Sequence, residues 1–369
     1  MEKFKFELDF EENLMQSTIS KALKKSYPPS VLREAVEERK INQQVHEFLS
    51  DQGLLSMLNP LKQGDVNLML CTILVNEAGR RLISFPLIEH LMALYVLKEE
   101  ATSKEIEDFE AGEKIATLGW KENVEFVVND GVHYVNGLVK SIPFADESDQ
   151  IIVPIRKDGQ DQVLILKTEG IKDQLRSVKT QDLTYPLYEL NLENVKIDHV
   201  STRLIHLDLE DFYRVADLLI AAELLGISQE SLQMTLDYTK ERKQFGVEIG
   251  KFQAVKHMLA DMHLLSESSK VSIEFGAWSV ENEGEDHDIV STIAKAYSAD
   301  AAIRVVESSI QVHGAVGFTW EHDLHFYLKR AYRLANMNKT SYEEREKVAS
   351  YFMGDLSPVN NKKIETVFS

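Results

Sequence analysis

Residues 241–262 carry the stretch that decides the fold, and they read ERKQFGVEIGKFQAVKHMLADM. This order of residue types predicts a helix that ends near Arg242, a short turn through Gly246 and Gly250, and a new helix that begins near Phe252. An arginine beside an aromatic residue and two glycines suits a phosphate, because the guanidinium pairs with phosphate oxygens and glycine lets the backbone approach closely. On these residues alone, an ordinary helix–turn–helix corner with a packed phenylalanine and a surface arginine is the favoured interpretation.

A second block lies about 50 residues further along the chain, where residues 311–322 read QVHGAVGFTWEH. Two long blocks in this order are far more specific than one short motif. Together they resemble the C-terminal signatures of the acyl-CoA dehydrogenase family of FAD-dependent flavoproteins. The resemblance extends more weakly through the N-terminal helices and the β-rich region, so it covers most of the chain.

The resemblance implies that the corner around Arg242 grips the ADP half of an FAD bound mainly to a neighbouring subunit. An exposed aromatic ring there can stack on a ligand ring, and a glutamine amide can bond a ring edge. Ala315 stands where the family commonly has a second glycine. The positions that match the family's flavin contacts are Arg242, Gln244, Phe245, Phe252, Gln253, Gln311, His313 and Gly314.

The residue pattern changes twice along the chain. Residues 1–110 are rich in helix formers and include a predicted helix at residues 30–40. Residues 111–205 alternate turn signals with short β-rich runs, which predicts a small antiparallel barrel or sandwich. Residues 206–369 return to a helical period, and we expect a C-terminal four-helix bundle. The predicted fold is therefore mainly α with a central β domain.

Composition and charge exclude several classes of protein. The net charge is −19 and the sequence pI is about 5.1, which argues against nucleic acid and anionic membrane surfaces as partners. Cys71 is the only cysteine, so an intrachain disulfide is impossible. The run from His322 to His325 does not lead us to predict a metal site. No apolar run approaches the roughly 18 residues of a membrane span, and we expect a soluble cytosolic protein.

The chemistry of the resembling family requires a carboxylate, which removes the α-proton of an acyl thioester while a hydride leaves the β-carbon for the flavin. By register the family's usual glutamate falls near Asn338, where this chain has no acid. Other members place the base on the helix before the first signature, at the position of Ala216. Asp217 lies next to it and is the candidate base, with Glu223 as the alternative. A carboxylate in this apolar stretch is costly unless paired or functional, and for Glu223 a structural salt bridge is favoured.

Two functions are consistent with the resemblance. The first is FAD-dependent oxidation of an acyl-CoA to a trans-2-enoyl-CoA in fatty acid β-oxidation, by a homodimer or homotetramer that passes electrons to an electron-transferring flavoprotein or similar acceptor. The second is a catalytically silent subunit that completes the FAD site of a larger chain in a heterotetramer. This chain resembles the smaller subunits of such assemblies, because it is short, carries DLHFYLKRA at residues 323–331, and lacks a glutamate-Gly-Thr motif.

Overall fold

A computed structural model describes residues 8–58, 68–97, 101–157, 159–282 and 287–354. The first third of the described chain is helical, as the residue pattern predicts. The helix expected at residues 30–40 is α2, which begins at proline, where the missing N–H costs no hydrogen bond. The helices of this part are α1 (Phe10–Ser26), α2 (Pro29–Glu38), α3 (Gln43–Asp51), α4 (Leu68–Arg81), α5 (Leu87–Leu97) and α6 (Ser103–Glu110).

The central region forms two four-stranded sheets, with strand orders β1-β4-β5-β8 and β2-β3-β7-β6. All pairings in these sheets are antiparallel except that of β1 with β4. The hairpin of β2 and β3 stands between β1 and β4 in the sequence and returns the chain in its original direction. The strands are β1 (Ala116–Leu118), β2 (Lys121–Asn129), β3 (Val132–Pro143), β4 (Gln150–Lys157), β5 (Gln160–Lys167), β6 (Leu175–Val178), β7 (Leu187–Lys196) and β8 (Thr202–His206).

Alternate residues of these strands point into a separate apolar core. Val139 of β3, Ile151 and Val153 of β4, Leu164 of β5 and Leu190 of β7 are all fully buried there. Because side chains alternate across a strand, every second residue of each strand reaches the space between the sheets. The arrangement is a small sandwich, one of the two forms predicted from the turn signals and short β-rich runs of this region.

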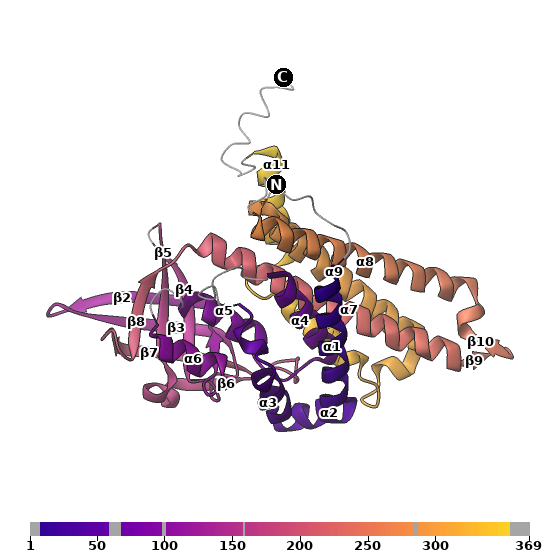
Figure 1. The fold of residues 1–369 in the computed structure, drawn as a ribbon, viewed down its shortest axis with the longest axis horizontal. Coiled ribbons are helices and arrows are strands. Elements are labelled where there is room, and N and C mark those ends of the chain that lie inside the picture. Colours follow the sequence, from indigo (N-terminus) through magenta and orange to yellow (C-terminus); the bar gives the residue numbers. More distant parts are fainter. Residues whose placement is uncertain (1–7, 59–67, 98–100, 158, 283–286, 355–369) are drawn as a thin grey trace, which may run out of the picture.

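Long helices follow the sandwich: α7 (Leu209–Glu241), α8 (Gln253–Glu281), α9 (His287–His313), α10 (Leu324–Ala335) and α11 (Ser341–Met353). In Figure 1, α7, α8 and α9 run away from the strands, and the small β9–β10 hairpin lies at their far end. The 33 residues of α7 span about 50 Å at 1.5 Å per residue. One helix therefore connects the sandwich to the hairpin.

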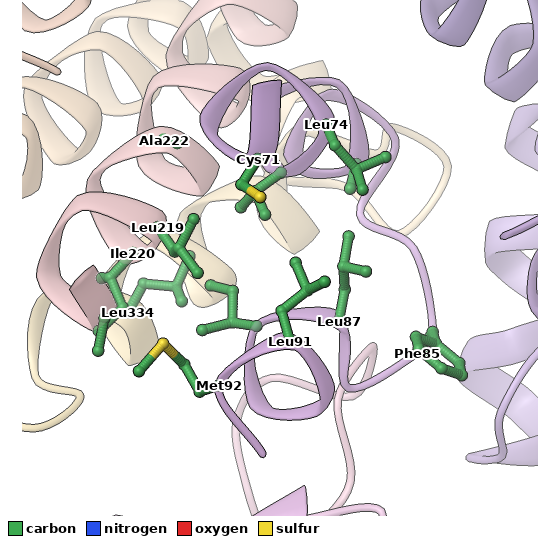
Figure 2. Packing of buried hydrophobic residues seen from close by; sticks show 14 of the residues in the cluster. Cys71, Leu74, Phe85, Leu87, Leu91, Met92, Leu219, Ile220, Ala222 and Leu334 are labelled. Atoms are coloured by element: carbon green, nitrogen blue, oxygen red, sulfur yellow. The ribbon is translucent and has the colours of Figure 1, made fainter. Parts of the chain in front are cut away.

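Helices from the first and last thirds of the chain share one core. Figure 2 shows Leu74 of α4, Leu91 of α5, Leu219 of α7 and Leu334 of α10 packed together. The division into domains at residues 110 and 205 stays a prediction, although the change to strands falls between α6 and β1. No helix in the described ranges is both long and apolar enough to span a membrane.

Two glycines let α4 and α7 approach closely at the edge of this core. A Cβ atom on Gly79 would lie 2.4 Å from the carbonyl oxygen of Glu223, and one on Gly226 would lie 2.1 Å from that of Asn76. Any larger residue at either position would force the two backbones apart. The pair of glycines thus fixes how α7 sits against the N-terminal helices.

Candidate functional site

The corner predicted from residues 241–262 is a tight β-hairpin between two long helices. The strands β9 (Lys243–Gln244) and β10 (Val247–Glu248) are joined by Phe245 and Gly246, whose φ angles of 53° and 82° are both positive. Two positive φ angles are typical of the turn that matches the natural twist of a hairpin. The turn holds the Phe245 ring 93% exposed. The exposed ring at the hairpin tip is available for contact with a ligand or another chain.

The second sequence block lies against the end of α7, next to this hairpin. The ring of His313, at the end of α9, stacks on Tyr238 with centroids 4.2 Å apart. Its Nδ1 lies 2.8 Å from the carbonyl oxygen of Ser309, so Nδ1 carries the hydrogen and Nε2 is an acceptor. That Nε2 is buried without a hydrogen-bond partner. Burial lowers the pKa of His313, which keeps the ring neutral at pH 7.

The exposed side chains of the corner suit a phosphate and a ring. Within the described residues, Arg242 has no carboxylate at ion-pair distance, and both Arg242 and Gln244 are exposed. Phe252 contacts the Phe245 ring edge-on with centroids 6.2 Å apart. Gly314 has a φ of 65° and open space where a Cβ would stand. Gln253 and Gln311 are exposed. A free guanidinium, amides and an exposed ring fit the ADP half of FAD.

The candidate base Asp217 is buried in a network of charges. Its side chain is 3% exposed, and its Oδ1 lies 3.1 Å from Nζ of Lys295 on α9. Lys295 also lies 2.9 Å from Oε1 of Glu344 on α11. Burial lowers the pKa of Lys295, but the charges of Asp217 and Glu344 outweigh it and raise that pKa above its ordinary value. Asp217 is therefore paired with a permanent cation.

Asn338 is the residue nearest to which the family register places the usual catalytic glutamate. It lies in the connection between α10 and α11 with a φ of 62°, a conformation that asparagine tolerates better than most residues. Its Nδ2 donates to Oδ1 of Asp217 over 3.3 Å. The structure thus brings the two positions predicted for a base into contact. Between them they supply one carboxylate, and Lys295 already neutralises it.

Glu223, the alternative base, forms a salt bridge in the core. Its Oε1 accepts from Nη1 of Arg330 on α10 over 2.6 Å. Arg330 is 1% exposed and also donates from Nε to Asp182 over 2.8 Å. The guanidinium groups of Arg330 and Arg333 lie over the ring of Tyr185. Glu223 therefore holds α7, α10 and the loop before β7 together, the structural role weighed for it.

A pocket of about 220 Å³ lies beside Asn338, between the sandwich and α10. That volume is below the roughly 300–1,000 Å³ of typical small-molecule sites. Trp120 borders the pocket and is fixed by a 2.9 Å hydrogen bond to Glu89, which also accepts from Tyr185 over 2.6 Å. The lining residues are Trp120, Lys121, Ser141, Pro143, Leu187, Arg333, Asn336, Met337 and Asn338.

The corner and the base position lie far apart on one uninterrupted helix. Asp217 and Arg242 are 25 residues apart along α7 and its end, which corresponds to about 37 Å. Figure 1 shows the β9–β10 hairpin at the end of the molecule opposite the sandwich. In one copy of the chain, the corner around Arg242 therefore cannot reach the pocket beside Asn338.

His322 and His325 do not gather ligands for a metal. His322 contacts the ring of His313, and His325 stacks on Trp320 with centroids 4.9 Å apart. Among the residues that the structure describes, no three histidine, cysteine or acidic side chains are placed to share an ion.

Comparison with known proteins finds similarity to acyl-CoA dehydrogenases. The model described as acyl-CoA dehydrogenase, C-terminal domain, matches residues 214–340. Acyl-CoA dehydrogenase IpdE2 of Mycolicibacterium smegmatis is 27% identical over 338 residues, covering 89% of this chain and 94% of the relative. The chain resembles the acyl-CoA dehydrogenase family. Acyl-CoA dehydrogenase FadE34 of Mycobacterium tuberculosis is 28% identical over 71% of this chain and 35% of its own length.

Solved structures of acyl-CoA dehydrogenases share the fold. A chain of the ChsE4-ChsE5 complex from Mycobacterium tuberculosis superimposes with a TM-score of 0.86 at 20% identity, covering 96% of this chain and all of the other. Butyryl-CoA dehydrogenase from Megasphaera elsdenii gives a TM-score of 0.83 at 19% identity, covering 95% of this chain and 100% of the other. These structures show that the chain has the acyl-CoA dehydrogenase fold.

Sequence reasoning missed the partners of the acidic residues. Lys295 and Glu89 are buried charged side chains that no motif marks, and Arg330 lies in the DLHFYLKRA stretch, where nothing predicts its burial. Glu89 does give a local signal, because it stands in the otherwise apolar run of α5, as Asp217 and Glu223 do in α7. A lone acid in an apolar helix thus predicts a buried network in this protein, but not which residue completes it.

Proposed function

We propose that this chain is the subunit that completes the flavin site of a heteromeric acyl-CoA dehydrogenase. Its corner around Arg242 binds the ADP half of an FAD whose ring lies in a second, related chain. That second chain supplies the catalytic carboxylate. Oxidation of the acyl-CoA is then an activity of the assembly.

The observation that carries this proposal is the state of the base position. Asn338 is not an acid. The carboxylate to which it donates is that of Asp217, whose Oδ1 lies 3.1 Å from Nζ of Lys295. A general base must be free to accept a proton near the operating pH. The Oδ1 of Asp217 already contacts both Lys295 and Asn338, so this carboxylate oxygen is occupied by protein partners. The small pocket beside Asn338 agrees with a chain that does not hold the reacting groups.

The corner supplies binding and orientation. Arg242 pairs with phosphate oxygens, Phe245 covers a ring face, and the unpartnered Nε2 of His313 accepts from a ligand N–H or O–H. Gln244, Phe252, Gln253, Gln311 and Gly314 complete this surface. When bound, FAD supplies the redox chemistry by taking up the hydride of the acyl chain. An electron-transferring flavoprotein or a similar acceptor then reoxidises the assembly.

The decisive experiment compares the chain alone with the chain co-expressed beside a second acyl-CoA dehydrogenase of the same organism that carries the glutamate-Gly-Thr motif. We expect the chain alone to be colourless and inactive with acyl-CoA, and the pair to be yellow and active. Arg242→Ala in the pair is expected to weaken FAD retention about tenfold, because a charge-assisted contact contributes about 1.5–3 kcal/mol. Lys256→Ala, an exposed lysine of α8, is the matched control. Yellow, active protein from the chain alone contradicts the proposal.

A second candidate is independent oxidation of acyl-CoA with Asp217 as the base. The contact between Asn338 and Asp217 favours it, because Asn338 borders the pocket. On this reading the chain alone binds FAD, and acyl-CoA reduces it. Asp217→Asn then abolishes flavin reduction while FAD stays bound. If this variant reduces flavin at the parental rate, Asp217 has a structural role only.

A further inference from the structure

A second cavity, of about 770 Å³, lies between α6 and one end of the sheet β1-β4-β5-β8. It is separate from the pocket beside Asn338. Gln150 lines the cavity and pairs with Ala116 at the start of β1, whereas Trp120 of the other pocket follows the end of that strand. The volume is within the range of small-molecule sites. The proposed flavin function does not use this cavity.

Two buried polar side chains on its wall each have an oxygen atom without a hydrogen-bond partner. Nε2 of Gln150 donates to Glu105 over 2.6 Å, which fixes the amide so that Oε1 is an acceptor pointing elsewhere. That Oε1 has no hydrogen-bond partner, and neither does Oγ1 of Thr168. Gln150 is 3% exposed and Thr168 is fully buried. Buried polar atoms in native proteins are nearly always bonded, so each of these two oxygens has the capacity to accept a hydrogen bond from a hydroxyl or amine in the cavity.

Five of the residues that line the cavity are lysine or arginine and four are acidic, including Asp149 and Glu169, so basic side chains are in slight excess in a strongly acidic protein. Lys114 pairs with Asp108, and Arg203 donates to Glu105 over 2.9 Å. Three further lysines that line the cavity have no carboxylate at ion-pair distance within the described residues: Lys104, Lys167 and Lys172. All three are exposed, against a net charge of −19 for the whole chain. Unpaired lysines around a polar cavity attract an anion, and phosphate is a ligand that lysine binds well.

We propose that this cavity binds a small phosphate ester that carries hydroxyl groups. The phosphate lies among Lys104, Lys167 and Lys172. The hydroxyls donate to Oε1 of Gln150 and bond with Oγ1 of Thr168 deeper in the cavity. The site combines charge at its mouth with acceptors at its wall, so it distinguishes a hydroxylated phosphate from free phosphate and from an uncharged sugar.

Isothermal titration calorimetry of the full chain tests this with ribose 5-phosphate, ribose and inorganic phosphate as probes. We expect ribose 5-phosphate to bind at least tenfold more tightly than either of the others. Thr168→Val is expected to weaken that binding about tenfold without lowering Tm, because it removes a hydroxyl that has no partner in the protein. Lys167→Gln with Lys172→Gln is expected to weaken binding tenfold or more.

The charge-matched control is Lys21→Gln with Lys25→Gln on α1, whose lysines are exposed and distant in sequence from the cavity. It should leave the affinity unchanged. Absence of binding by ribose 5-phosphate overturns the proposal, as does equal binding by inorganic phosphate. Equal loss of affinity in the control pair overturns it too, because that result reflects net charge alone. A lower Tm in Thr168→Val overturns the assignment of Thr168 as a ligand-facing group.

Discussion

Lys295→Met removes the only cation of the buried network around Asp217 among the described residues. Lys295 is 1% exposed and contacts Asp217 at 3.1 Å and Glu344 at 2.9 Å. Both carboxylates are themselves buried, with Glu344 fully so. Methionine matches the length of the lysine stem and fills its volume. The substitution therefore tests the charge with little change in packing.

The expected loss of unfolding free energy is about 3–5 kcal/mol at pH 7, the cost of leaving a buried charge without its partner. Two carboxylates lose the same cation here, which places the value in the upper part of that range. Neutralising one acid should recover part of it, so Lys295→Met with Asp217→Asn is expected to be more stable than Lys295→Met alone. Lys256→Met, on the exposed face of α8, should change stability by less than about 0.5 kcal/mol.

The loss of unfolding free energy caused by Lys295→Met also depends on pH. Burial raises the pKa of Glu344, and the charge of Asp217 raises it further, while Lys295 lowers it. Removal of Lys295 takes away its lowering effect on this pKa, so that burial and Asp217 raise it against the charge of Lys339 alone. The folded state then holds a proton more tightly than the unfolded state does, so the penalty shrinks as pH falls from 7 toward 5. Urea unfolding followed by circular dichroism measures both effects. A cost below about 1 kcal/mol at pH 7, or a penalty that grows on acidification, refutes the reasoning.

Further predictions concern the fold. Gly226→Ala should cost about 1–3 kcal/mol, because its Cβ would lie 2.1 Å from the backbone oxygen of Asn76; urea unfolding beside the open-surface control Gly170→Ala measures it. Burial lowers the pKa of His90 to about 4. The unfolded state takes up that proton first, so stability should fall as pH drops from 6.5 to 4, by up to about 1.4 kcal/mol per pH unit from this group. His90→Gln should reduce the slope; an unchanged slope contradicts the assignment. Arg330→Met should cost about 3–5 kcal/mol, since Asp182 and Glu223 lose their buried partner; a thermal melt indistinguishable from that of the parent argues against it.

The sequence alone predicts the sites that depend on local pattern. The turn through Gly246 between two helices follows from turn chemistry, whereas its β-hairpin form is not predicted. The order of helical and β-rich regions follows from hydrophobic period. The acids Asp217 and Glu223 also stand out, because each interrupts an apolar helical stretch. Their local sequence therefore predicts that each is either paired or functional.

The partners of those acids are beyond such reasoning. Glu223 and Arg330 are 107 residues apart, and Lys295 reaches Asp217 from another helix. Only tertiary packing decides which of the many lysines and arginines is buried beside which acid. The parallel pairing of β1 is hidden for a related reason, since a strand of three residues carries too little pattern to reveal its neighbour.

The length of α7 has a consequence for how this chain tolerates insertions. At one end, Leu209 donates its backbone N–H to Asp161 of the sandwich, and at the other, Tyr238 stacks on His313. In between, Gly226 presses against the backbone of α4. One added residue would turn everything beyond it by about 100° and advance it by about 1.5 Å. The number of residues in α7 thus fixes both the distance between its two ends and the direction in which the side chains at each end point. We expect insertions to be accepted beyond its ends and rejected within it.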